Sequence, residues 1–157
     1  MKVLIILIVL VMAGTVRAEI GDFKKATSAG ERKEARMEFK ENLKKIKDEK
    51  KQKIVEKLDI RFNEVNLKRT AQMTKHLDRM TEILSKVTGD TASASSAIQT
   101  ARDAVTAQAA KTYVITISTE ANLKMDVGKV RSQLEYDLKA VQELVKSARL
   151  AVRALLK

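Results

Sequence analysis

The feature that most constrains the fold is a repeat of apolar side chains between Ile54 and Val87. They recur every three or four residues, which is the spacing of one face of an α-helix. A helix with such a stripe must bury it, and a second stripe of the same kind runs from Leu123 to Leu155. The two stripes predict two long helices packed against each other. The positions in the first stripe are Ile54, Leu58, Phe62 and Val65, then, after a polar gap, Met73, Leu77, Met80, Leu84 and Val87.

Nothing in the sequence breaks the first of these helices. The chain contains no proline, and no glycine occurs between Glu31 and Val87. We therefore expect one unbroken helix over Glu31–Val87, about 85 Å long. The step from Val65 to Met73 is one residue longer than a heptad, a stutter that relaxes supercoiling. Gly89 follows as a residue suited to a left-handed helix cap and turn.

Composition agrees with an all-α fold. The chain is 45% hydrophobic and 32% charged but only 3% aromatic, which is typical of long packed helices. We expect a very long N-terminal helix packed against one or two C-terminal helices, as a helical hairpin or a three-helix bundle. Thr91–Lys111 is rich in small residues that allow close helix packing. Its predicted inner face is Ala94, Ile98, Ala101, Val105 and Ala109.

Residues 112–118 follow a different rule. Tyr113, Ile115 and Ile117 alternate with less apolar neighbours, and a period of two in such residues favours extended backbone. We predict a short extended connector that either lies against solvent or pairs with a second copy of itself, which would make the protein a homo-oligomer. The alternative is that this segment is helical, so that 91–157 is one helix and the fold is a plain hairpin.

The N-terminus has the features of an export signal. Lys2 precedes an apolar run from Val3 to Ala13, and Val16-Arg17-Ala18 resembles a signal-peptidase site. The run is too short for a membrane span, which needs about 18 apolar residues or more. We predict a cleaved signal peptide over 1–18, a flexible leader over 19–30 and one elongated helical domain over 31–157. The protein would then be exported to the periplasm, the cell surface or the medium, with no integral membrane span after cleavage.

The first part of the predicted long helix is strongly basic. Six cationic side chains fall within an arc of about 80° on a helical wheel, and the chain as a whole has a net charge of +11. Phe39, Leu43 and Ile46 form only a thin apolar line, so we expect this part to project into solvent. The predicted basic ridge, a candidate site for a polyanion or a protein partner, consists of Lys33, Arg36, Lys40, Lys44, Lys47 and Lys51.

The sequence offers no catalytic constellation. It has no cysteine and a single histidine, so a nucleophile with its base or a cysteine metal site is not available. His76 lacks carboxylate partners at a metal-binding spacing, and we interpret it as a partly exposed structural residue. We predict a protein that is not an enzyme, with no catalytic, cofactor-binding or metal-binding residues.

Several segments resemble a known group of proteins. They are Ile54-Val55-Glu56-Lys57-Leu58-Asp59, His76-Leu77-Asp78-Arg79-Met80 and Gln108-Ala109-Ala110-Lys111-Thr112-Tyr113. They are similar to an uncharacterised family of exported, basic, helical proteins of candidate-phyla bacteria. The resemblance implies export and a helical fold, and it implies no activity.

Two functions follow as hypotheses. In the first, a non-enzymatic exported protein binds macromolecules through the basic ridge. The partner would be a cell-wall polymer, nucleic acid without sequence specificity, or an acidic protein. In the second, the protein is a periplasmic holdase chaperone, similar in size, charge and export to the jellyfish-shaped trimeric chaperones but without their N-terminal strand.

Overall fold

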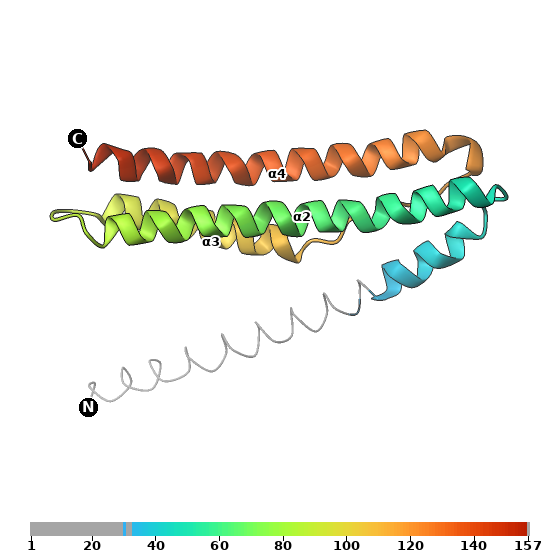
Figure 1. Cartoon of the computed structure of the whole chain (residues 1–157), viewed down its shortest axis with the longest axis horizontal. Helices are drawn as coiled ribbons and strands as arrows, with labels where there is room; N and C mark the ends of the chain where they lie inside the picture. Colours follow the sequence, from blue (N-terminus) through green and yellow to red (C-terminus); the bar gives the residue numbers. More distant parts are fainter. Residues whose placement is uncertain (1–29, 31–32, 157) are drawn as a thin grey trace, which may run out of the picture.

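The computed structural model describes residue 30 and residues 33–156 (Figure 1). The predicted signal peptide over 1–18 and the leader as far as residue 29 lie outside the described residues. Residues 33–43 are helical, and the longer helices follow. The structure confirms the all-α class, and no strand occurs in the part of the chain it describes. The elements are α2 (Glu49–Leu84), α3 (Ala92–Ala110), the short 3-10 helix η1 (Glu120–Asn122) and α4 (Leu123–Ala154).

Three helices form a bundle. In Figure 1, α2 and α4 lie side by side and run in the same direction, while α3 returns along them in the opposite direction. α3 has 19 residues, whereas α2 has 36 and α4 has 32. The connector, residues 111–119, continues from α3 toward the far end of the bundle. Of the two predicted arrangements, the three-helix bundle is therefore the one observed.

The prediction of one unbroken helix from Glu31 to Val87 is wrong. The first helix ends at residue 43, and α2 begins after a turn at 44–48. Asp48 starts α2 because its carboxylate accepts hydrogen bonds from the backbone N–H groups of Lys50 (2.8 Å) and Lys51 (3.2 Å). Gln52 also donates from Nε2 to the carbonyl of Leu43 at 3.2 Å. The chain therefore leaves the first helix without a glycine or proline, because Asp48 caps the start of a new helix five residues later.

The turn lets residues 33–48, which we call the arm, fold back onto the bundle. Phe39, Leu43 and Ile46 are all buried and join the hydrophobic cluster that includes Val55 and Ile115. The expectation that this part of the chain projects into solvent is therefore also wrong. A thin apolar line suffices because the arm has to cover only one end of the bundle (Figure 1).

The connector is non-helical, as predicted. Tyr113, Ile115 and Ile117 are buried, and the intervening Thr116 is exposed. An extended residue advances about 3.3 Å, against about 1.5 Å in a helix. The connector therefore lets the short α3 match the length of its two neighbours.

Side chains of the neighbouring helices satisfy the connector's backbone. Asn63 on α2 accepts from the N–H of Tyr113 (2.9 Å) and donates to its carbonyl (2.7 Å), as a paired strand would. Asp59 Oδ1 accepts from the N–H of Ile115 at 3.2 Å. Asp126 on α4 accepts from the N–H of Ser118 at 2.9 Å. The prediction that the connector faces solvent or pairs with a second copy is wrong, because α2 and α4 supply these partners within one chain.

The core follows the predicted stripes with one shift. Leu77, Met80 and Leu84 are buried as predicted, but at the start of α2 Val55 is buried and Ile54 is 56% exposed. The shift arises because the arm and the connector cover α2 on the side that carries Val55 and Asp59. The polar gap in the stripe also lies in the interior, since Asn66 and Thr70 are buried there.

Two glycines behave differently. Gly89, in the turn between α2 and α3, has a positive φ of 124°, so the predicted turn is confirmed. The predicted helix cap at Gly89 is wrong, because α2 ends earlier, at Leu84, with Ser85 as its C-cap. Gly128 lies in the first turns of α4, and a Cβ built there would meet nothing within 4 Å. A close helix crossing at Gly128 is therefore excluded among the described residues.

Candidate functional site

The six residues of the predicted basic ridge do not lie on one helix. The turn at 44–48 separates Lys33, Arg36 and Lys40 from Lys51, so the single helical wheel on which the six residues aligned does not exist. Four of the six carry contacts within the fold. Arg36 pairs with Asp59, Lys44 pairs with Glu41, Lys51 pairs with Glu120, and the backbone of Lys47 donates to the same Glu120. Two of the six cationic side chains, Arg36 and Lys51, thus help to attach the arm to the rest of the fold.

Glu120 holds the end of the arm and the start of α2. Its carboxylate accepts from Lys51 Nζ at 2.8 Å and from the N–H of Lys47 at 2.9 Å. The hydrogen bond from Lys51 and then that from Lys47 lower the pKa of Glu120, and the same pairing raises the pKa of Lys51. These contacts bring η1 against the 44–48 turn and give Lys51 a structural role.

Asp59 joins the arm, α2 and the connector. It is fully buried, and its carboxylate accepts from Arg36 Nη1 at 3.0 Å in addition to the N–H of Ile115. Burial raises the pKa of Asp59, while the hydrogen bond from Ile115 and the charge of Arg36 oppose that rise. Arg36 is therefore the counter-ion of a buried carboxylate.

A buried polar layer separates the two hydrophobic clusters of the bundle. Gln108 donates to Asn66 Oδ1 at 3.0 Å and to the Tyr113 hydroxyl at 2.6 Å, and this hydroxyl donates to Asp137 Oδ2 at 2.7 Å. Lys111 Nζ completes the layer at 2.9 Å from the same carboxylate. Burial and the bond to Asp137 raise the pKa of Tyr113 to about 12. Every buried side-chain polar atom described has a partner, which is what a structural layer requires.

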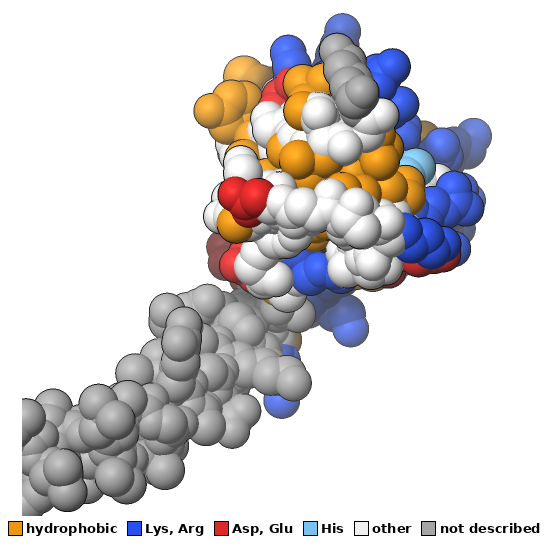
Figure 2. Space-filling model, turned by 90° about the vertical axis from the view of Figure 1, so that its left-hand side faces the viewer, with side chains coloured by type: hydrophobic (Ala, Val, Ile, Leu, Met, Phe, Trp, Pro, Cys, Tyr) orange, Lys and Arg blue, Asp and Glu red, His pale blue; other side chains and the backbone are white. Residues whose placement is uncertain are grey.

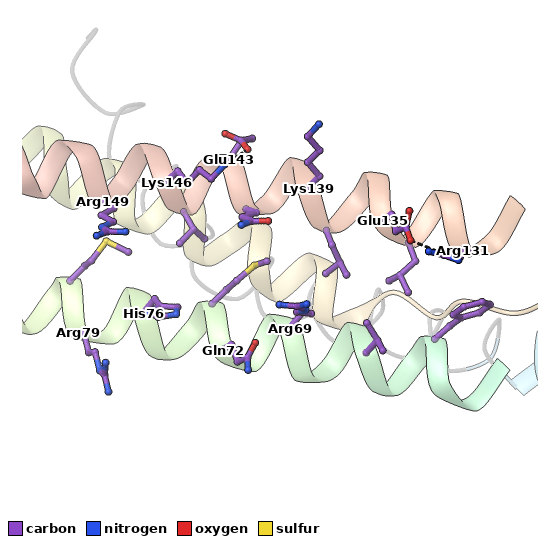
Figure 3. Close-up of a pocket in the computed structure, with 18 of the residues that line it drawn as sticks. Arg69, Gln72, His76, Arg79, Arg131, Glu135, Lys139, Glu143, Lys146 and Arg149 are labelled. Atoms are coloured by element: carbon purple, nitrogen blue, oxygen red, sulfur yellow. Dashed lines mark hydrogen bonds and ion pairs between the residues drawn. The ribbon is translucent and has the colours of Figure 1, made fainter. Parts of the chain in front are cut away.

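A groove runs between α2 and α4, and no residue of α3 lines it. Its volume is about 1680 Å³. Apolar side chains from both helices line it along its whole length (Figure 3). We call them the groove floor: Leu58, Phe62, Val65, Met73, Met80 and Ile83 from α2, and Val127, Leu134, Leu138, Val145, Val152 and Leu156 from α4 and the residues after it.

The rims of the groove are basic. Two acidic residues line it, and both are already paired within α4, Glu135 with Arg131 at 2.8 Å and Glu143 with Lys146 at 2.6 Å. The remaining rim cations make no ion pair with any acidic residue described. They are Arg61, Arg69 and Arg79 on α2, and Lys139, Arg149 and Arg153 on α4.

Two of these cations point into the groove. In Figure 3, Arg69 of α2 and Arg149 of α4 point into the space between the two helices, whereas Arg79 and Lys139 point away from it. Figure 2, which views the bundle from its end, shows Lys and Arg gathered on one side beside exposed hydrophobic side chains. The groove thus combines an apolar floor with positive charge on both walls.

Sequence reasoning missed this site, although a signal was present. Arg61, Arg69 and Arg79 are spaced by eight and ten residues, and Arg131, Lys139 and Arg149 repeat the same spacings. Because α2 and α4 run in the same direction (Figure 1), the two sets lie along opposite walls. These matching spacings predict a shared basic groove only if α2 and α4 are known to be parallel neighbours.

His76 lines the same groove and is exposed. Across residues 33–156, no three histidine or acidic side chains come together in a way that could hold a metal ion. The same part of the chain contains no helix with the length and apolar character that a bilayer crossing demands.

Comparisons with protein-family models, with curated proteins and with solved structures find no match to this chain. The resemblance to exported helical proteins of candidate-phyla bacteria therefore stays a prediction. The groove and its charges are the basis on which a function can be argued.

Proposed function

We propose that the protein is a non-enzymatic, exported binding protein whose site for an acidic macromolecule is the groove between α2 and α4. The observation that carries the proposal is the groove itself. Six cations that make no ion pair with a described acidic residue line it, and two of them, Arg69 and Arg149, point into the space above a partly exposed apolar floor. Positive potential on both walls would attract and orient an anionic partner, and contact with the floor would hold it.

This proposal moves the binding surface from the arm to the groove. Arg36 and Lys51 are engaged with Asp59 and Glu120, so they would have to give up structural contacts to bind a partner. The six rim cations of the groove would break no ion pair with a described residue when they bind a partner. Lys33 and Lys40 on the arm are exposed and would add long-range attraction.

Charge reversal tests the proposal. Arg69→Glu combined with Arg149→Glu places two acids at the opening of the groove. The matched control is Lys68→Glu combined with Lys75→Glu, which makes the same charge change on exposed positions of α2 outside the groove. Fluorescence anisotropy with labelled poly-L-glutamate would measure binding to the purified protein.

The groove variant should weaken binding by about tenfold or more, and the control by about threefold or less, since rim charges act locally as well as through net charge. Binding should also fall steeply as salt increases. Equal losses in the two double variants, or binding that persists unchanged in roughly half-molar salt, would contradict the proposal.

A holdase chaperone is the second candidate, and the length of the open apolar floor is the observation that favours it. A holdase would bind non-native chains of any charge, whereas the basic rims predict a preference for acidic ones. Light scattering from a heat-aggregating client separates the two. Equal suppression for acidic and basic clients would favour the holdase, and no suppression of a basic client would favour the selective binder.

A further inference from the structure

The bundle has an unfilled position. α2 and α4 lie side by side, α3 with its connector packs against them on one side, and the groove lies on the other. Four-helix bundles fill the corresponding position with one more helix, whose apolar side chains enter the space between two neighbours. The geometry of the groove therefore corresponds to the seat of a fourth helix.

The floor restricts what can fill this seat. At the bottom of the groove four floor residues are buried, namely Phe62, Met80, Leu134 and Val152. Above them Leu58, Val65 and Leu138 are half-buried, and Ile83 is 42% exposed. A polyanion such as nucleic acid or an acidic polysaccharide could neutralise the rims but has no apolar face to cover the floor. A helix with an apolar stripe removes the floor from water and leaves its flanks at the rims. The floor thus favours an amphipathic helix over a uniformly charged polymer.

The extent of the floor sets the length of the helix. It runs along α2 from Leu58 to Ile83, which corresponds to about 38 Å of helix axis. A partner helix of about 25 residues would cover it from end to end.

The rims set the charge of the helix. The groove is lined by Arg61, Arg69 and Arg79 from α2 and by Lys139, Arg149 and Arg153 from α4. Of these, Arg69 and Arg149 point into the space between the two helices, one from each wall (Figure 3). A helix lying in that space presents the two flanks of its apolar stripe to Arg69 and Arg149, as the positions beside the seam do in coiled coils. Acidic residues on both flanks are therefore complementary, and basic ones are repelled.

We infer that the groove binds one acidic amphipathic helix of a partner protein, about 25 residues long, which completes a four-helix bundle with α2, α3 and α4. This inference rests on the proposed function of the same groove. A second copy of the chain docked groove to groove is a poor occupant, because the rim cations of the two copies would face each other. Residues 1–29 are also poorly matched, since they contain only two acidic residues, Glu19 and Asp22, against four basic ones.

Three designed peptides of about 25 residues test the inference. The first has leucine at the seam and glutamate on both flanks, the second has lysine in place of the glutamates, and the third shuffles the first so that its apolar stripe is lost. Poly-L-glutamate is the fourth probe. Calorimetric titration into the purified protein and far-UV circular dichroism of the mixtures measure affinity and induced helix.

The glutamate-flanked helix should bind at least about tenfold more tightly than the shuffled peptide or poly-L-glutamate, with a gain of helix on mixing, and the lysine-flanked helix should not bind. Arg69→Glu with Arg149→Glu should abolish this preference, and Lys68→Glu with Lys75→Glu should keep it. All four positions are exposed, and thermal unfolding would verify that both double variants remain folded.

The outcomes separate the inference from the proposed function. If poly-L-glutamate and the shuffled peptide bind as tightly as the helix, and still depend on Arg69 and Arg149, the helix inference is wrong and the acidic-macromolecule site stands. If the lysine-flanked helix binds as well as the glutamate-flanked one, the inference is wrong and the holdase gains support. If no anionic probe binds, both proposals fall.

Discussion

At the scale of single residues, Asn63 shows how a helix can take the place of a strand. Its amide bonds to both the N–H and the carbonyl of Tyr113 at 2.9 and 2.7 Å. A side-chain amide has one donor group and one acceptor, as a peptide unit does, so it can complete the pairing of an extended residue. Polar residues inside the apolar stripe of α2 are therefore part of the packing and not interruptions of it.

Asn63→Ala should destabilise the protein by about 2 kcal/mol or more, because it leaves two backbone polar groups of Tyr113 without their partner. Asn122→Ala is the matched control. Asn122 is exposed and its side chain makes no capping bond, so the change should be within about 0.5 kcal/mol. Urea unfolding followed by circular dichroism measures both. Equal stability of the two variants would show that the side-chain pairing of the connector contributes nothing.

Asp137 gives a pH-dependent prediction. Burial would raise its pKa, but hydrogen bonds from Tyr113 and Lys111 outweigh this, and the pKa lies below the ordinary value of 3.8. A lowered carboxyl pKa stabilises the fold above the ordinary value, and this stabilisation is lost as the pH falls through the folded-state pKa. Asp137→Asn should therefore cost about 1 to 3 kcal/mol at neutral pH, and the difference from the parent should shrink below pH 3.8.

Denaturant unfolding at neutral pH and at a series of acid pH values measures this difference. Glu143→Gln is the control on the same helix, since its pair with Lys146 is more than half exposed on both sides and should be worth less than about 1 kcal/mol. A penalty for Asp137→Asn that is constant from neutral to acid pH would show that its charge does not stabilise the layer.

At the scale of elements, the helical periods were readable from the sequence and the break between the arm and α2 was not. Ala94, Ile98, Ala101 and Val105 are buried on α3 as the spacing predicted, but Gln108 is buried in place of Ala109. The turn at Gly89 is also where it was predicted. The break depends on Asp48, Gln52 and Glu120, and Glu120 reaches the turn from a distant part of the chain. Local propensity favours a continuous helix there, and contacts with η1 and burial of Ile46 favour the turn.

Gly128 offers a test at this scale. It lies in α4, and a Cβ built at this position would meet nothing within 4 Å. Glycine therefore lowers the stability of the helix here, and no close contact requires it. Gly128→Ala should stabilise the protein by up to about 1 kcal/mol. Thermal unfolding measures the change, with the exposed Ser132→Ala in the same helix as a control for propensity alone. A loss of stability at Gly128→Ala would mean that the start of α4 is packed more closely than the structure shows.

At the scale of the whole molecule, the bundle explains why the groove, our proposed binding site, could not be found from the sequence. All residues of the groove floor except Ile83 and Leu156 belong to the predicted stripes, so a model of two packed helices places them in the core. α3 with its connector packs on the other side of α2 and α4, and no α3 residue lines the groove, whose floor is partly exposed. The high net charge of +11 was visible, but its concentration along two walls depends on the parallel course of α2 and α4.

The central claim is that acidic partners bind in the groove and not on the arm. Methyl NMR spectra of the purified protein, recorded as the glutamate-flanked helix is added, would locate the contact directly. We predict the largest shifts at methyl groups of the floor, led by Val65, Leu138 and Val145, because they line the seat. Shifts confined to the arm, at Leu43 and Ile46, with the floor unchanged would contradict the account.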